Sequence, residues 1–66
     1  MDNNKQLIEQ LGITLGVLDA LIKDLQALNG CAGILQPYII EEIGVARNMR
    51  LKLEIAFSIA KQLARG

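Results

Sequence analysis

The fold is decided by residues 7–28, which read LIEQLGITLGVLDALIKDLQAL. Large apolar side chains return in this stretch at spacings of three and four residues, which is the period of one face of an α-helix. The stripe consists of Leu7, Leu11, Leu15, Leu18, Ile22, Leu25 and Leu28, with Ile8 and Leu21 beside it. The spacing predicts a helix over about residues 4–29, capped at its start by Asp2 or Asn3. It is expected to end at Asn29-Gly30, whose residue types tolerate the left-handed turn that closes a helix.

The segment after this helix has the composition of a turn followed by a second helix. Gly30 to Gly33 contains two glycines and no charge, and Pro37 suits the first turn of a helix because its missing N–H is not needed there. We therefore expect a turn over about residues 30–35 and a helix over about 36–65. Gly44 is its weak point, since glycine costs about 1 kcal/mol relative to alanine in a helix interior. One continuous helix, straight or kinked at Gly44, is favoured over two helices that break there.

The second helix carries two apolar series with a seven-residue repeat, and Arg50 interrupts them. One series is Ile39, Ala46, Leu53 and Ala60, and the other is Ile43, Phe57 and Ala64. Together they predict a coiled-coil-like seam that packs on the first helix. A further apolar set lies to one side of the seam: Tyr38, Val45, Met49, Ala56, Ile59 and Leu63. This arc is wider than one antiparallel neighbour covers and predicts a second partner.

The size of the chain leads to the same expectation. It has 66 residues, 52% of them hydrophobic, and a formal net charge of zero. Domains below about 70 to 80 residues seldom bury enough core to offset the entropy of folding and need a staple such as a disulfide, a metal or self-association. With one cysteine and no histidine, self-association is the staple that remains. The prediction is an all-α antiparallel helical hairpin, residues 1–66 forming a single domain, that dimerises into a four-helix bundle.

The same composition argues against several classes of protein. Without histidine, and with Cys31 alone in the turn, there is no usual general base, activated thiol or metal cage, so we expect no enzyme, cofactor or metal. Cys31 is interpreted as a small filler of the turn. The segment after residue 5 is interrupted by Glu9, Asp19, Lys23 and Asp24, so it lacks the uninterrupted apolar stretch of a signal peptide. The uncharged run Leu25 to Ile40 is too short and too polar to span a membrane. A cytoplasmic protein is therefore expected.

Two surfaces are candidates for binding. Small residues repeat every four positions on the first helix, on a face expected to point away from the leucines, and they form either a solvated rear face or a groove for helix docking. Docking is slightly favoured, because two exposed glycines in a helix would cost about 2 kcal/mol together. Together with three apolar residues of the second helix, the predicted protein-binding or oligomer interface is Gly12, Ile13, Gly16, Val17, Ala20, Met49, Ile55 and Ile59.

The second candidate is a basic stripe on the second helix, formed by Arg47, Arg50, Lys61 and Arg65. From residue 47 onward the chain carries five basic residues and one acid, whereas residues 1–46 carry two basic residues and six acids. An ordinary solvated helix face is the favoured interpretation. Binding to nucleic acid is less favoured, because the chain has no net positive charge and its single tyrosine and single phenylalanine are too few for base stacking.

These features favour a small non-enzymatic protein–protein interaction module that acts as a homo-oligomer and binds another protein as an adaptor, a chaperone-like subunit or an inhibitor. One alternative is a nucleic-acid-binding four-helix-bundle dimer that uses the basic stripe. Another is a structural subunit that self-assembles through a second apolar patch. A peripheral membrane helix is disfavoured, because the chain has no tryptophan and no dense cluster of basic residues.

Overall fold

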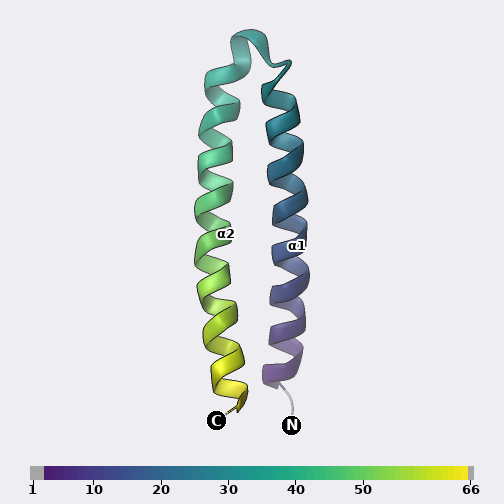
Figure 1. Ribbon diagram of the computed structural model, residues 1–66, viewed down its shortest axis with the longest axis vertical. Helices are drawn as coiled ribbons and strands as arrows, with labels where there is room; N and C mark the ends of the chain where they lie inside the picture. The colour runs from purple at the N-terminus through teal and green to yellow at the C-terminus, as the bar shows by residue number, and fades with distance from the viewer. Residues whose placement is uncertain (1–2, 66) are drawn as a thin grey trace.

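The computed structural model, which describes residues 3–65, is a helical hairpin (Figure 1). Helix α1 spans Asn3–Asn29, a short 3-10 helix η1 spans Gly33–Leu35, and helix α2 spans Gln36–Arg65. The two long helices run antiparallel, so the start of α1 and the end of α2 lie at the same end of the rod. The predicted helices are confirmed to within one residue, and α2 continues through Gly44 without a break. The predicted cap at Asp2 lies outside the described residues, and Asn3 is already helical.

The turn lies within the predicted residues 30–35, but its left-handed residue comes later than expected. Asn29-Gly30 was expected to supply the left-handed residue, but Gly33 adopts it, with φ of +56°. The reason is that α1 ends by tightening: the N–H groups of Gly30 and Cys31 donate to the carbonyls three residues back, at 3.2 and 3.0 Å. The direction therefore changes at Gly33, where the absence of a Cβ makes a positive φ inexpensive.

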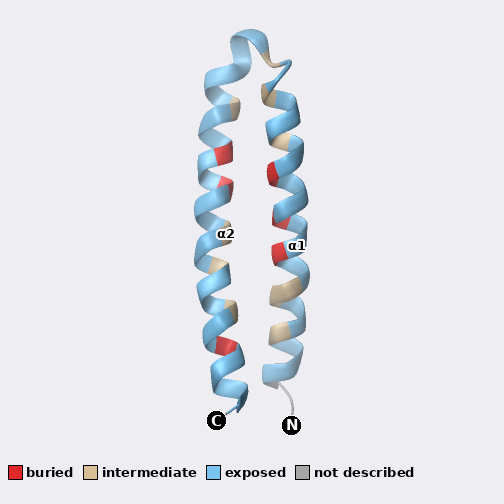
Figure 2. Cartoon of the chain, in the orientation of Figure 1, coloured by how far each residue is buried: buried red, intermediate tan, exposed pale blue. Residues whose placement is uncertain are grey.

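The core is a narrow seam between the two helices (Figure 2). Its buried residues are Leu15, Leu18 and Ile22 on α1 and Ile43, Ala46 and Ala60 on α2. Around them lie the half-buried side chains of Ile8, Leu11, Leu25, Ile39, Leu53 and Phe57. The predicted seam is therefore confirmed along most of its length, including the position of Arg50, which is half-buried within it.

The seam departs from the prediction at its ends. Leu7 and Leu28 are half exposed, at 50% and 51%, and Ala64 is exposed, while Ile8 and Asn29 are more buried than the leucines next to them. At about 100° per residue, two successive steps of four, or two of three, carry a side chain away from the stripe. Leu7 precedes Leu15 by two steps of four and Leu28 follows Ile22 by two steps of three, so both rotate out of the interface.

A single hairpin leaves much of the chain uncovered. The Cα positions extend over 51 × 14 × 11 Å, and the radius of gyration is 15.2 Å, against about 11 Å for a compact chain of this length. The accessible surface is 5138 Å², whereas a compact protein of 7.2 kDa exposes about 4,100 Å². None of the described side chains is fully buried. The two helices therefore hold one another through one layer of contacts.

Candidate interaction surfaces

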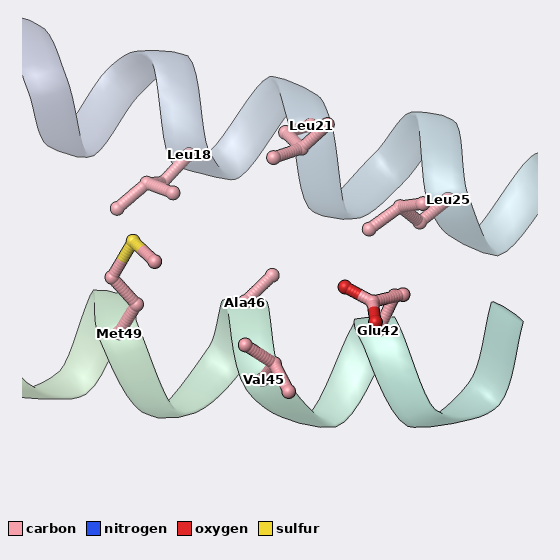
Figure 3. A pocket seen from close by; sticks show the side chains of 7 residues that line it. All are labelled: Leu18, Leu21, Leu25, Glu42, Val45, Ala46 and Met49. Atoms are coloured by element: carbon pink, nitrogen blue, oxygen red, sulfur yellow. The ribbon is translucent and has the colours of Figure 1, made fainter. Parts of the chain in front are cut away.

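An apolar groove opens between residues 18–25 of α1 and 42–49 of α2 on one long face of the hairpin (Figure 3). Leu18, Leu21 and Leu25 of α1 point toward α2 across it, and the remaining lining residues, all from α2, are Glu42, Val45, Ala46 and Met49. Leu18 and Ala46 also belong to the buried seam, so the groove is an opening onto the core itself. We call this side of the hairpin the groove face.

The groove is suited to side chains more than to a small molecule. Its volume of about 230 Å³ lies below the range of about 300–1,000 Å³ typical of small-molecule sites. Glu42 is the one charged residue in its lining. Leu21, Val45 and Met49 remain 45%, 51% and 49% exposed. A surface of this shape and composition would gain from being covered by apolar side chains of another helix.

The opposite long face is held by ion pairs. Arg50 reaches from α2 to α1, where its Nε donates to Oδ1 of Asp19 and its Nη2 donates to Oδ2 at 3.4 Å. Its Nη1 donates to Glu54 one turn further along α2. The hydrogen bond from Arg50 holds the pKa of Asp19 below its usual value of 3.8, and the two carboxylates raise the pKa of Arg50. We call this side the ion-pair face.

Asp19 was not among the predicted site residues, although the sequence contains a signal for it. Asp19 and Arg50 stand at equal distances on either side of a point between Ile34 and Leu35, the middle of the turn. In an antiparallel hairpin such residues lie at the same level. Both also adjoin the seam at helical spacing, since Asp19 lies three residues before Ile22. Opposite charges at matching levels on the edges of two facing stripes predict a pair across the helices.

The four members of the predicted basic stripe differ in their surroundings. Arg50 is engaged by Asp19 and Glu54, and the Nζ of Lys61 lies 4.4 Å from the centre of the Phe57 ring. Arg47 and Arg65 are exposed. The stripe is thus a mixed surface in which half of the cationic groups already have partners within the chain.

The small-residue row on α1 does not form a single face. Gly12 was expected to point away from the leucines, but it lies against α2: a Cβ at Gly12 would be 3.8 Å from two carbons of the Phe57 ring. A row of four-residue steps rotates by about 40° per step. It therefore starts beside the seam at Gly12 and reaches the rear of α1 at Ala20. Gly16 and Ala20 are exposed, and a Cβ at Gly16 would meet nothing within 4 Å.

The other predicted interface residues are exposed but separated. Ile13 and Val17 are 60% and 62% exposed on α1. On α2, Met49 lines the groove, whereas Ile55 stands nine residues from Ala46, about half a turn around the helix, and so faces away from α1. Ile59 lies between these two directions and is 51% exposed. The predicted set therefore spans several surfaces and not one patch.

Within residues 3–65, no group of three or more histidine, cysteine, aspartate or glutamate side chains could hold a metal ion. Cys31 is exposed at the tip of the hairpin, with its Sγ 3.6 Å from the carbonyl oxygen of Leu28. Neither helix, over the part of the chain described, has an apolar stretch long enough to cross a membrane.

Comparison of the chain with protein-family models, with curated proteins and with solved structures yields no match. Its function therefore has to be inferred from the physical properties of the hairpin.

Proposed function

We propose that this chain is a non-enzymatic protein–protein interaction module that works as a homo-oligomer. The carrying observation is the surface that one hairpin leaves uncovered. The accessible surface of the hairpin, 5138 Å², exceeds by about 1,000 Å² the area expected of a compact protein of the same mass. That excess is comparable to the roughly 800 Å² that each partner contributes to a standard protein–protein interface.

The character of the exposed surface supports the same proposal. Large apolar side chains are exposed on the groove face and also on the rear of α2, where Ile40, Leu51 and Ile55 are 53%, 58% and 54% exposed. Soluble monomers seldom expose contiguous apolar patches of more than a few hundred Å². One of the two surfaces serves self-association, and the other is available to a different protein. An adaptor, a chaperone-like subunit or an inhibitor each requires such a second surface.

The non-enzymatic part of the proposal rests on composition. The chain has no histidine and one cysteine, so the commonest general base and a paired thiol are both missing from its sequence. The nucleic-acid alternative has less support than the sequence suggested, since Arg50 is committed to Asp19 and Glu54. The structural-subunit alternative draws support from the rear of α2, because two apolar surfaces facing different directions can propagate an assembly.

Light scattering over a wide concentration range, with far-ultraviolet circular dichroism on the same samples, tests the proposal. We expect a helical oligomer of defined mass that loses helicity as it dissociates on dilution, because a single hairpin buries too little to remain folded. A fully helical monomer at every concentration would contradict the proposal. An assembly that grows steadily with concentration would favour the structural subunit.

The partner-binding part needs a separate test. We expect the oligomer to capture a distinct protein from extract of the source cells, and Ile55→Lys to abolish capture while leaving the oligomer intact. Capture that survives both Ile55→Lys and Leu51→Lys would show that the rear of α2 is not the binding surface.

A further inference from the structure

The outer side of α2 carries a second heptad seam whose residues are not buried against α1. Its members recur at alternating spacings of four and three, the a and d pattern of a coiled coil, and all are exposed. They are Tyr38, Glu42, Val45, Met49, Lys52, Ala56, Ile59 and Leu63. Six are apolar, and two, Glu42 and Lys52, carry opposite charges. We call this set the outer seam.

We propose that a second copy of this chain packs on the groove face with the two α2 helices antiparallel, so that Glu42 of each copy meets Lys52 of the other. This inference rests on the proposed homo-oligomer and specifies its face, its direction and its register.

The choice of face follows from the cost of covering each side. The groove face opens onto the core through Leu18 and Ala46, so a helix placed there extends an existing apolar interior. Covering the ion-pair face would instead remove water from Asp19, Arg50 and Glu54, and desolvation of charges can exceed what their attraction returns. The uncovered area, about 1,000 Å² beyond that of a compact chain, is enough for one such interface.

The direction follows from the distribution of charge along the rod. Near the tip, residues 23–46 carry Lys23 against three acids, Asp24, Glu41 and Glu42. The middle of the rod, residues 15–22 and 47–54, carries Asp19 and Glu54 against three basic residues, Arg47, Arg50 and Lys52. A parallel arrangement would place two acidic tips together. An antiparallel arrangement places the tip of each copy beside the basic middle of the other, which electrostatics favours.

The register follows from the two charges in the outer seam. When the two-fold axis passes level with Arg47, Glu42 faces Lys52 of the second copy and Val45 faces Met49 of the second copy, because both pairs are symmetric about position 47. Moving the register by one heptad toward the C-terminus would set Glu42 against Ile59 and Lys52 against Met49. Both charges would then be covered by apolar side chains without a partner, which is costly.

Glu42 and Lys52 cannot form this pair within one chain. They are ten residues apart on a straight helix, so their backbones are separated by about 15 Å. Any coupling between them therefore reports contact between copies. Exchange of the two charges is the corresponding experiment, with the dimer dissociation constant measured by sedimentation and helicity followed by circular dichroism.

We expect Glu42→Lys and Lys52→Glu each to raise the dissociation constant about tenfold to a hundredfold, since two symmetry-related attractions become repulsions. The double variant should return it to near the original value. An equimolar mixture of the two single variants should form heterodimers in preference to either homodimer. Glu9→Lys and Lys5→Glu, which change the net charge by the same amounts at exposed positions of α1 away from the outer seam, should leave the constant within about twofold.

The outcomes separate this inference from the proposed function. A parent chain that remains a folded monomer contradicts the homo-oligomer itself. A parent dimer whose single charge variants bind as tightly as the controls overturns the face and register while the homo-oligomer stands. Single variants that weaken the dimer without rescue by the double variant also overturn the register, since they show no contact between positions 42 and 52.

Discussion

The two long faces of the hairpin are built from the same helices. They differ in how many of their side chains have partners within the chain. On the ion-pair face, Arg50 links both helices through Asp19 and also holds Glu54. On the groove face, Val45 and Met49 stand half exposed above the core. Asp19 and Leu21 are only two positions apart on α1, yet the helical rotation of about 100° per residue assigns them to opposite faces.

The relative orientation of the two helices and the stability of the protein therefore depend on different surfaces. Exposed ion pairs contribute little to stability, but a pair that crosses between helices disfavours rotations that would separate it. Burial of apolar surface stabilises a protein in proportion to the area removed from water, and the apolar surface of the groove face remains exposed in a single hairpin. The ion pairs therefore help to fix the rotation of the helices that leaves the groove exposed. Covering the groove is expected to stabilise the protein more than the ion pairs do.

The largest effect is expected where the groove meets the core. Leu18→Ala should lower the free energy of unfolding by about 2–5 kcal/mol, because Leu18 is buried and its loss opens the groove into the seam. Urea denaturation followed by circular dichroism at fixed protein concentration measures this. Leu51→Ala, at a position 58% exposed, is the control and should stay within about 0.5 kcal/mol of the parent. Equal losses at the two positions would show that the groove floor is not part of the core.

A substitution at Val45 disrupts the groove face without changing a residue of the buried seam. Val45→Lys should raise the dissociation constant of the homo-oligomer about a hundredfold, because each copy loses a covered valine and gains an ammonium group that needs water. The matched control is Ile55→Lys on the rear of α2, since the parent residues are 51% and 54% exposed. Sedimentation equilibrium compares the two. If only the Ile55 variant dissociated, the surface for self-association would lie on the rear of α2.

Two glycines sharpen the comparison by testing surfaces outside both faces. Cβ atoms at Gly16 and Gly44 would meet nothing within 4 Å. Alanine at either position should therefore raise the free energy of unfolding by about 1 kcal/mol through helix propensity alone. Thermal unfolding at constant concentration measures the change. If Gly16→Ala instead weakens the oligomer, the small-residue row of α1 is a contact surface, as its spacing originally suggested.

The smallest effect is expected on the ion-pair face. The pKa of Asp19 is lowered in the folded chain by its hydrogen bond from Arg50. Its contribution is therefore present above the unfolded value of about 4 and is lost as the pH falls through the lower folded value. Asp19→Asn should slightly reduce stability at neutral pH, and less so at high salt. The stability difference between the parent and the variant should shrink below pH 4, and a difference that persists there would show that it does not arise from the carboxylate charge.

Much of the fold could be read from the sequence because its causes are local. The leucine and isoleucine spacings, Pro37 and the glycines of the turn determine where helices begin and end, and the structure agrees to within one residue. The contacts between the two helices were harder to predict from the sequence. Gly12 was assigned to the wrong side because a row of small residues was treated as straight, although four-residue steps rotate around the helix. Asp19 was missed because its partner is 31 residues away.

By itself, the sequence determined two amphipathic helices, the turn that joins them, and an apolar surface larger than one hairpin can bury. These depend on residue type and on the helical period, which act over a few residues. Only the tertiary structure decided the level and rotation at which the helices meet, and with them the pairing of Arg50 with Asp19, the contact of Gly12 with Phe57 and the opening of the groove beside Leu18. The physical reason is that several rotations of two broad apolar stripes bury similar areas. The choice among them depends on which side chains interdigitate and which charges keep both a partner and access to water.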